Sequence, residues 1–556
     1  MDEQYANLIK IIEQNYKQVP NKNSRRNNSI DDEYHFNRYS YSNFISRSEF
    51  SRDRDRILFS RAFRRLEHKA QIYSHERGDH FRTRLTHTLE VLQIARNISR
   101  YLGLNEDLTE AIALGHDIGH TPFGHEGERV LDQILSGKAE YKELKYKINY
   151  TGFKHNFNSL KVLDEIEKKY DNESGLNLTW QVLEGILKHT RIKRNNELWC
   201  DIDRFLLNLS NSKFNIKFEN LLNYEYSVTL EGQVVAIADE IAQRQHDLDD
   251  GMRDSGLGLN YDDIFKEVKK YICEILDSHR DESERHFVDL LKNLYDILDK
   301  RDKGTKVYKR NTIIRDIIEY FICDVTLMSF KNIAEMAEDC QITEEDYKFF
   351  GRKLITYSQL GIELDKKLDQ YIKNRIVNSN EVNKFDGKAN YVIKRLFKAY
   401  YSNPRQMSKY ALERLSTLIS DNSEIYSIRF SEIKDNDTGN PLEVKNINFS
   451  NNSPDEVNKL IDYLKMNIDI KEILCPDEFF NSDLTEVVNN CIMLKVNKLD
   501  ELQNISLAEV IQMNDHIKFV KCMLEDHYAF LSVICDYISG MTDNYAEEEY
   551  QKLYQT

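Results

Sequence analysis

The sequence predicts a mostly α-helical protein. Apolar residues recur at three-to-four spacing along most of the chain, which is the period of an amphipathic helix. The 556 residues include only 6 prolines, the residue that helix interiors exclude. With 40% hydrophobic residues the chain can bury a large core, and its length indicates two or more domains or one large helical body with insertions.

The first elements follow from composition and capping signals. Residues 1–54 are predicted to form a mobile N-terminal arm, because most of this stretch is rich in Asn, Ser, Arg and Asp. Order is predicted to begin near Ile57 with amphipathic helices, and Gly103 is predicted to close the second of them. Asn105 is a suitable N-cap for the next helix, which leads to His116.

Helical patterning resumes beyond a predicted loop at residues 136–152. The further predicted helices cover residues 160–166, 181–189 and 231–250. Alternation of apolar and polar residues after Ile425, with turn chemistry at residues 435–441, predicts a small strand-containing insert over residues 421–480. Residues 481–556 are predicted to return to helices.

Charge, cysteines and hydropathy exclude several classes of protein. The net charge of −16 argues against a dedicated non-specific nucleic-acid binder, so any anionic substrate must be attracted by a local field. The 8 cysteines have no close pair, so neither a disulfide framework nor a zinc knuckle is indicated. The N-terminus lacks a basic region followed by an apolar run, and no apolar run of about 18 residues occurs. We therefore expect no membrane span and a cytoplasmic location.

Residues 114–128 concentrate ionisable side chains around the adjacent pair His116 and Asp117. Neighbouring side chains on a helix normally point to different sides, so both can reach one ion only where the helix ends or is distorted. Gly115 and Gly119 flank the pair and permit such a distortion. The pair is therefore predicted to be part of a metal site.

A second group of side chains follows this pair. The segment Thr121–Gly124 stops helix propagation, and the chain then presents His125 and Glu128 toward the same place. We predict that they are catalytic groups beside the metal. The alternative is a hydrogen-bonded pair that only stabilises a loop.

Two further residues complete a candidate ligand set. His87 lies within an apolar helical pattern, and Asp239 follows five consecutive apolar residues, where an unpartnered carboxylate would be costly to bury. A divalent ion bound by nitrogen and oxygen would offset that cost. The alternatives are a hydrogen-bonded core histidine for His87 and a buried cap or ion-pair partner for Asp239. The predicted metal ligands are His87, His116, Asp117 and Asp239.

The order H…HD…D of these four ligands resembles that of the HD-domain metallophosphohydrolases. Surrounding segments extend the resemblance to the deoxyguanosine triphosphate triphosphohydrolase (dGTPase) branch. These segments are Ser60–Leu66, Lys69–Gln71, Phe81–His87, His116–His125, Gly152–Asn156 and Leu230–Ala242. The similarity is dense over about residues 45–260 and faint afterwards, with Tyr401–Pro404 its clearest late match.

The resemblance implies a helical HD catalytic core over residues 55–260 and a helical body over residues 261–420 that completes the substrate pocket. It implies metal-dependent hydrolysis of dGTP, and of other dNTPs as a wider range, to deoxynucleoside and inorganic tripolyphosphate. Mg²⁺ or Mn²⁺ is the implied cofactor. Relatives in this family commonly form hexamers or other oligomers and respond to a nucleotide effector or single-stranded DNA, so we expect a homo-oligomer with such a response.

Roles for individual residues follow from the resemblance and from helical spacing. By the resemblance, His125 is the general acid in line with the leaving 5′-oxygen, and Glu128 orients its imidazole. Arg84 lies on the same helical face as a predicted ligand, where it can bind a phosphate or pair with a carboxylate such as Glu90. His120 can donate to another phosphate if its turn stays helical.

The resemblance also indicates how base and sugar are recognised. Gln71 resembles the family's base-contacting glutamine, and Asp247 resembles the carboxylate that holds the sugar 3′-hydroxyl. Gln243 stands where the family usually carries a tyrosine that packs against the deoxyribose. Loss of that aromatic ring predicts weaker discrimination against a 2′-hydroxyl or a changed base preference.

Three further substrate contacts are predicted in one short segment. Lys154 stands where the family commonly has a glutamate, and it adds positive charge near the expected path of the triphosphate. His155 and Asn156 match the family and are predicted to contact phosphate or the nucleophilic water.

Two other functions stay open at the level of sequence. One is a different HD phosphohydrolase chemistry, that of a nucleotidase or phosphodiesterase, which detection of tripolyphosphate among the products would exclude. The other is a non-catalytic nucleotide-sensing or single-strand-binding protein. The presence of both His125 and Glu128 argues against this second alternative.

Overall fold

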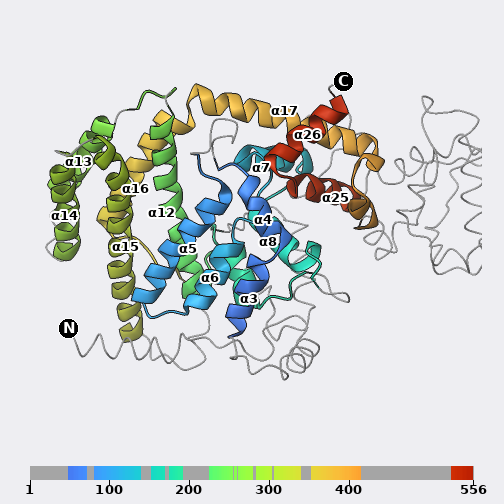
Figure 1. The fold of residues 1–556 in the computed structure, drawn as a ribbon. Coiled ribbons are helices and arrows are strands. Elements are labelled where there is room, and N and C mark those ends of the chain that lie inside the picture. The colour runs from blue at the N-terminus through green and yellow to red at the C-terminus, as the bar shows by residue number, and fades with distance from the viewer. Residues whose placement is uncertain are drawn as a thin grey trace, which may run out of the picture. The chain divides into compact units, whose positions relative to one another are not determined.

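The structure is a computed structural model that describes residues 48–71, 81–138, 152–169, 175–191, 224–254, 256–259, 261–279, 284–302, 306–339, 352–414 and 528–554. Within these ranges the ordered elements are helices, and β pairing is limited to isolated bridges of Ala70 with Thr83 and Lys168 with Gly175 (Figure 1). The prediction of a mostly α-helical fold is confirmed. The strand-containing insert predicted for residues 421–480 lies outside the described residues.

The chain becomes helical earlier than the sequence predicted. Helix α3 (Glu49–Leu58) begins before Ile57, so the last residues of the predicted arm belong to a helix. Ser48 caps this helix, because its hydroxyl accepts a first-turn N–H at 3.0 Å. The charged residues that suggested a mobile arm have partners: Arg54 Nη1 lies 2.8 Å from Glu110 Oε2. The preceding residues of the arm lie outside the described ranges.

Three packed helices form the centre of the fold (Figure 1). They are α5 (Arg84–Tyr101), α6 (Glu106–Gly115) and α12 (Leu230–Arg253). Helix α5 ends before Gly103, whose φ of 71° is left-handed, as the sequence predicted. Asn105 caps α6, since its side chain accepts a first-turn N–H at 3.0 Å. The predicted boundaries between these two helices are therefore confirmed.

The described residues fall into two compact units. One comprises residues 1–132, 151–391 and 540–545, and the other comprises residues 133–150, 392–539 and 546–556. All candidate site residues belong to the first unit. In its core, α3, α5, α6, α9 (Trp180–Leu187) and α12 bury apolar side chains such as Ile57, Ile98, Leu108, Ile112, Ile186 and Val235.

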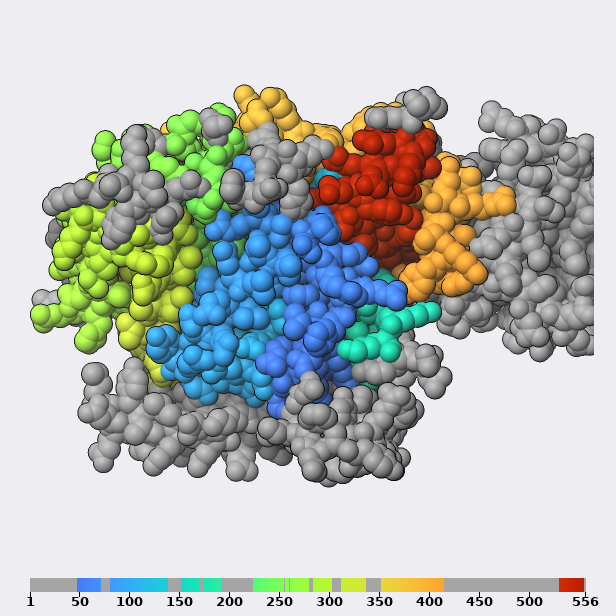
Figure 2. All heavy atoms as spheres, viewed as in Figure 1, coloured from blue at the N-terminus to red at the C-terminus, as the bar shows by residue number. Residues whose placement is uncertain are grey.

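The remaining helices complete the two units. They are α4 (Arg61–Arg65), η1 (Leu66–His68), α7 (Gly124–Leu135), α8 (His155–Lys161), the π-helical η3 (Val162–Ile166), α13 (Tyr261–Ser278), α14 (Arg285–Asp302), α15 (Lys306–Asp339), α16 (Gln359–Ile372), the π-helical η6 (Lys373–Val377), α17 (Asn380–Ser402), η7 (Pro404–Gln406), α25 (Tyr528–Ser539) and α26 (Asp543–Tyr554). Figure 2 shows α5, in blue, at the surface of the first unit, where it packs against α15. No helix in the described part of the chain is long and apolar enough to cross a membrane.

Candidate metal and catalytic site

The end of α6 brings the adjacent pair His116 and Asp117 to one place. The helix ends at Gly115, and His116 is its C-cap residue, followed by a turn. Neither Gly115 nor Gly119 has a positive φ, so conformational freedom is not their role. A Cβ on Gly119 would lie 2.1 Å from the Ser159 backbone nitrogen, so this glycine allows the turn to pack directly on α8.

The four predicted metal ligands converge. His87 Nε2 on α5 lies 3.0 Å from Asp239 Oδ1 on α12, and His116 Nε2 lies 3.7 Å from the same oxygen. Asp117 Oδ1 lies 3.5 Å from His116 Nε2, and Asp117 Oδ2 lies 3.8 Å from His87 Nε2. The histidines and Asp117 are buried, while Asp239 is partly exposed. His87, His116 and Asp239 therefore each place one ligand atom in the same small volume, and Asp117 adjoins both imidazoles.

The hydrogen bonds of the two imidazoles fit a cation at this point. His116 Nδ1 donates to the Ala113 carbonyl oxygen at 2.7 Å, and its Nε2 has no hydrogen-bond partner among the described residues, so loss of the Nε2 proton would leave a lone pair at this point. His87 Nδ1 lies 2.9 Å from Nδ1 of His246, whose Nε2 contacts the Glu90 carboxylate. A neutral His246 that donates to Glu90 must accept from His87, which leaves a lone pair on His87 Nε2 as well.

A lone pair therefore faces a carboxylate at 3.0 Å, between His87 Nε2 and Asp239 Oδ1. Two acceptors this close need a proton or a metal ion between them. Metal-binding histidines commonly donate their other nitrogen to a carbonyl or carboxylate, as His116 does directly and His87 does through His246. The residues present thus fit a divalent cation with nitrogen and oxygen ligands.

The charges in this cluster are strongly coupled. Burial raises the pKa of Asp117, but His120, His116 and Arg84 outweigh burial and hold that pKa well below its usual value. Burial would lower the pKa of His116, but the carboxylates of Asp117 and Asp239 raise it to about 9. A cation that binds here must therefore displace a proton from His116.

Arg84 pairs with Asp117 and not with Glu90, the carboxylate considered above as its alternative partner. Its Nη1 lies 2.7 Å from Asp117 Oδ2, and both side chains are buried. Glu90 instead lies 3.1 Å from Arg82 Nε and contacts His246, so pairing of Arg84 with Glu90 is wrong. The Nε and Nη2 atoms of Arg84 are buried and have no hydrogen-bond partner within the described ranges.

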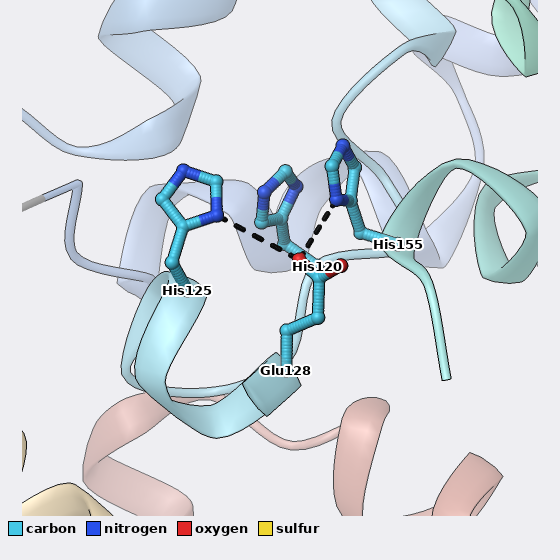
Figure 3. Close-up of side chains that lie close together, drawn as sticks. All are labelled: His120, His125, Glu128 and His155. Atoms are coloured by element: carbon cyan, nitrogen blue, oxygen red, sulfur yellow. Dashed lines mark hydrogen bonds and ion pairs between the residues drawn. The ribbon is translucent and has the colours of Figure 1, made fainter. Parts of the chain in front are cut away.

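A second cluster contains His120, His125, Glu128 and His155 (Figure 3). His125 and Glu128 lie one turn apart at the start of α7, and Glu128 Oε2 is 3.6 Å from His125 Nδ1. The same oxygen is 2.8 Å from Nδ1 of His155, and the rings of His155 and His120 stack with centroids 3.9 Å apart. His125 is the exposed member of the cluster. The structure therefore brings the predicted acid His125 together with Glu128.

The two clusters are adjacent. His120 Nδ1 lies 3.0 Å from Asp117 Oδ1, and His120 Nε2 has no hydrogen-bond partner in the described part of the chain. The turn after α6 does not continue as an α-helix, so the proposed helical placement of His120 is wrong, although His120 still lies between the clusters. Burial raises the pKa of Glu128, but His155 and His125 hold it below its usual value. Glu128 is therefore a carboxylate that is hydrogen-bonded to His155 and lies at ion-pair distance from His125.

The sequence did not identify His189 and His246 as site residues. His189 Nε2 lies 3.1 Å from His155 Nε2, while its Nδ1 donates to the Ile186 carbonyl oxygen at 2.6 Å. Its ring also packs edge-on against His116, with centroids 5.2 Å apart. Two signals were available: His189 ends a predicted helix, and His246 lies two helical turns beyond Asp239 on the same face.

The other predicted contacts have varied environments. Gln71 Oε1 and Asp247 Oδ1 are buried without a hydrogen-bond partner among the described residues. Burial, and to a smaller extent the negative charge of Asp250, raises the pKa of Asp247 well above its usual value. Lys154 is partly exposed, with Nζ 3.9 Å from Glu128 Oε1. Gln243 is partly buried on α12.

Asn156 makes contacts within the protein. Its Nδ2 donates to the Leu187 carbonyl oxygen at 3.0 Å and to Thr190 Oγ1 at 3.2 Å. This amide joins α8 to the end of α9, close to His189. Its amide nitrogen is therefore already engaged, whatever its carbonyl oxygen contacts.

Comparisons with known proteins identify the family of the chain. The HD domain model matches residues 84–244, and the phosphohydrolase-associated domain model matches residues 500–552. A deoxyguanosinetriphosphate triphosphohydrolase-like protein of Nitrobacter hamburgensis is 36% identical over 363 residues, which cover 65% of this chain and 80% of that protein. Proteins with the same description from Geobacter metallireducens and Bartonella quintana are 33% and 34% identical, and the matches cover 67% and 65% of this chain and 82% and 80% of those proteins. The chain therefore belongs to the deoxyguanosinetriphosphate triphosphohydrolase-like family of HD-domain phosphohydrolases.

Proposed function

We propose that the protein is a divalent-metal-dependent triphosphohydrolase that cleaves dGTP, and other dNTPs as a wider range, into deoxynucleoside and tripolyphosphate. The observation that carries this proposal is the contact between the two clusters. Asp117 Oδ1 lies 3.0 Å from His120 Nδ1, so the ligand set of His87, His116, Asp117 and Asp239 adjoins His125 and Glu128. The relatives are described as deoxyguanosinetriphosphate triphosphohydrolase-like proteins, and a description that names a nucleotide substrate supports the proposal.

Unpartnered polar atoms mark the surface that a nucleotide would contact. Gln71 Oε1, Arg84 Nη2, His120 Nε2 and Asp247 Oδ1 are all buried without hydrogen-bond partners among the described residues. A buried polar group without a partner is costly, so such atoms are expected where a ligand binds. These atoms belong to residues predicted to hold the base, the phosphates and the 3′-hydroxyl.

The chain's own residues account for binding and proton transfer. Arg84 and Lys154 would balance the negative charge of the triphosphate in a protein of net charge −16, beside the imidazoles of His120 and His155. When bound, the cation supplies polarisation of the α-phosphoryl group and a water of lowered pKa. His125 would donate a proton to the leaving 5′-oxygen, while Glu128 orients that ring through its Nδ1.

His155 has a defined role beside this pair. Its Nδ1 faces the Glu128 carboxylate at 2.8 Å, and its Nε2 faces His189 Nε2 at 3.1 Å. His189 already donates from Nδ1. Burial lowers the pKa of His189 to about 4, and the neighbouring imidazoles of His155 and His116 contribute to this shift. A neutral His189 accepts at Nε2, so His155 Nε2 can donate to it, and His155 would hold Glu128 in place from its other nitrogen.

The test is incubation of metal-free protein with each dNTP and rNTP, singly and mixed, with Mg²⁺ or Mn²⁺ restored. Nucleoside and tripolyphosphate are separated by ion-exchange chromatography. Deoxyguanosine with tripolyphosphate supports the proposal, and turnover of ribonucleotides would link Gln243 to relaxed sugar selection. Monophosphate or pyrophosphate products would indicate a different HD phosphohydrolase, and no product under any mixture would indicate a sensor.

Two additions to the same assay test the remaining proposals. Turnover that rises only in nucleotide mixtures or with single-stranded DNA would reveal an effector, and light scattering would measure the proposed homo-oligomer. Asp117→Ala is the control for catalysis, because it removes a predicted ligand from the buried cluster. Unchanged turnover in that variant would contradict a metal-dependent mechanism.

A further inference from the structure

Asp543 joins two remote backbone segments of the first unit. Its Oδ1 accepts the Phe123 N–H at 2.9 Å across 420 residues, and its Oδ2 accepts the Ala70 N–H at 2.8 Å across 473 residues. The side chain is buried, at 5% exposure. Both oxygens of one carboxylate are therefore committed to segments that the sequence separates by hundreds of residues.

Phe123 lies in the turn between His120 and His125, two of the three imidazoles of the second cluster. Its φ is 60°, and the φ of Gly124 is also 60°. A residue with a Cβ is strained in this left-handed region, and such a conformation persists only where the surroundings hold it. The Phe123 ring is buried, and Asp543 fixes the N–H of the same residue. The turn is therefore held from both its side chain and its backbone.

Ala70 lies between Lys69 and Gln71, the predicted base contact. The buried Lys69 ammonium donates to the backbone carbonyl oxygen of His120. Lys69 thus links the Ala70 segment to the start of the turn, and Asp543 links it to the middle of the turn. The two links set the separation between the predicted base contact and the imidazoles.

A simpler role for Asp543 would be that of a helix cap. It is the first residue of α26, where a carboxylate commonly stabilises the helix N-terminus. Its two oxygens, however, both bind other segments, and Thr542 Oγ1 accepts the Tyr545 N–H at 3.3 Å. Thr542 thus caps the helix, and Asp543 connects the two segments. Substitution of one residue at a time can therefore test the two roles separately.

We propose that Asp543 is a positioning residue that holds Gln71 and the His120–His125 turn at the separation that catalysis requires. It acts through the backbone of Ala70 and Phe123 and makes no contact with substrate. The inference rests on the proposed function and adds a residue from the matched phosphohydrolase-associated region, residues 500–552, to the catalytic apparatus.

The experiment compares the full-length wild type with Asp543→Ala, Asp543→Asn and the control Thr542→Ala. The substrate is dGTP with Mn²⁺, and kcat and KM are measured separately. Displacement of reacting groups by about 1 Å costs about 100-fold, so we expect that loss in kcat for Asp543→Ala. Asp543→Asn keeps one acceptor oxygen and should lose about 10-fold, and Thr542→Ala should change kcat less than about twofold.

Hydrogen exchange of the same four proteins gives a readout that needs no activity. The amides of Ala70 and Phe123 should exchange faster in both Asp543 variants and at the wild-type rate in Thr542→Ala, with α12 unchanged in all. Wild-type kcat and exchange in Asp543→Asn would overturn the inference, as would an equal loss of kcat in Thr542→Ala. If Asp543→Ala does not fold, Asp543→Asn decides. A wild type that releases no tripolyphosphate refutes the proposed function, and exchange then still decides whether Asp543 holds the two segments.

Discussion

Arg84 Nη1 and Asp117 Oδ2 lie 2.7 Å apart in a buried ion pair. Asp117 is also a candidate metal ligand, so one carboxylate would balance both the guanidinium and a bound cation. The pair places the Arg84 charge beside the predicted phosphate path. When substrate is absent, Asp117 balances that charge. Loss of either partner would leave a buried charge alone, which typically costs about 3–5 kcal/mol.

Arg84→Ala should therefore destabilise the metal-free protein more than the metal-loaded protein, because a cation can replace the lost charge beside Asp117. Thermal melting with EDTA and with Mn²⁺ measures the difference. A control is Arg129→Ala, whose arginine is exposed and pairs with Glu126 away from the ligands. Equal destabilisation of Arg84→Ala in both conditions would contradict the shared role of Asp117.

Metal affinity should rise with pH up to about 9. The pKa of His116 in the metal-free protein is raised from 6.5 to about 9, because Asp117 and Asp239 outweigh burial. Its proton therefore stabilises the metal-free fold fully below pH 6.5, and that contribution is lost as the pH rises through 9. The metal competes with the same proton. Calorimetric titration of Mn²⁺ at several pH values measures affinity and proton release, and pH-independent binding would refute the competition.

Glu231→Gln should stabilise the protein at alkaline pH. Burial raises the pKa of Glu231 from 4.5 to about 7, although its Oε1 accepts the Asn105 N–H at 3.1 Å. The raised pKa means that the stability of the neutral form is present below pH 4.5 and lost as the pH rises through 7. The difference corresponds to about 3 kcal/mol. Urea unfolding should give equal stability for wild type and variant near pH 4.5 and a more stable variant at pH 8.

His125→Ala should lower kcat by about 100-fold to 10,000-fold, the usual contribution of a general acid. KM for dGTP should change little, because this exposed ring is proposed to act on the leaving 5′-oxygen and not to bind the nucleotide. Lys154→Ala is the matched comparison, since Lys154 also approaches Glu128 but is predicted to act on binding. Steady-state kinetics of both variants should separate them: a fall in kcat for Lys154→Ala as large as that for His125→Ala would contradict this division.

Local features of the fold were predictable because short-range rules determine them. Asn105 caps α6 and Gly103 ends α5 through contacts with residues a few positions away. The start of α3 could not be predicted, because a run of charged residues has the same sequence pattern whether its side chains are solvated or paired. Arg54 finds Glu110 only after α3 and α6 have packed.

Site residues divide in the same way. His87, His116, Asp117 and Asp239 could be picked out because motif spacing identifies them; the structure groups His87, His116 and Asp239 and places Asp117 beside both imidazoles. The roles of His189 and His246 depend on which ring nitrogen faces which neighbour, and that is decided by the packing of helices distant in sequence. Asp543 carries no local signal at all, because a first-turn acidic residue is common in helices.

The 420 residues between Phe123 and Asp543 also impose an order in time. A ribosome adds about 5–20 residues each second, so the carboxylate is made about 20–80 s after the turn that it holds. From the synthesis of Asp239 onward the nascent chain carries every predicted metal ligand, yet its imidazole turn lacks one of its two supports. Full hydrolytic capacity would then arise only as synthesis nears its end, and a growing polypeptide would leave the dNTP pool around it intact.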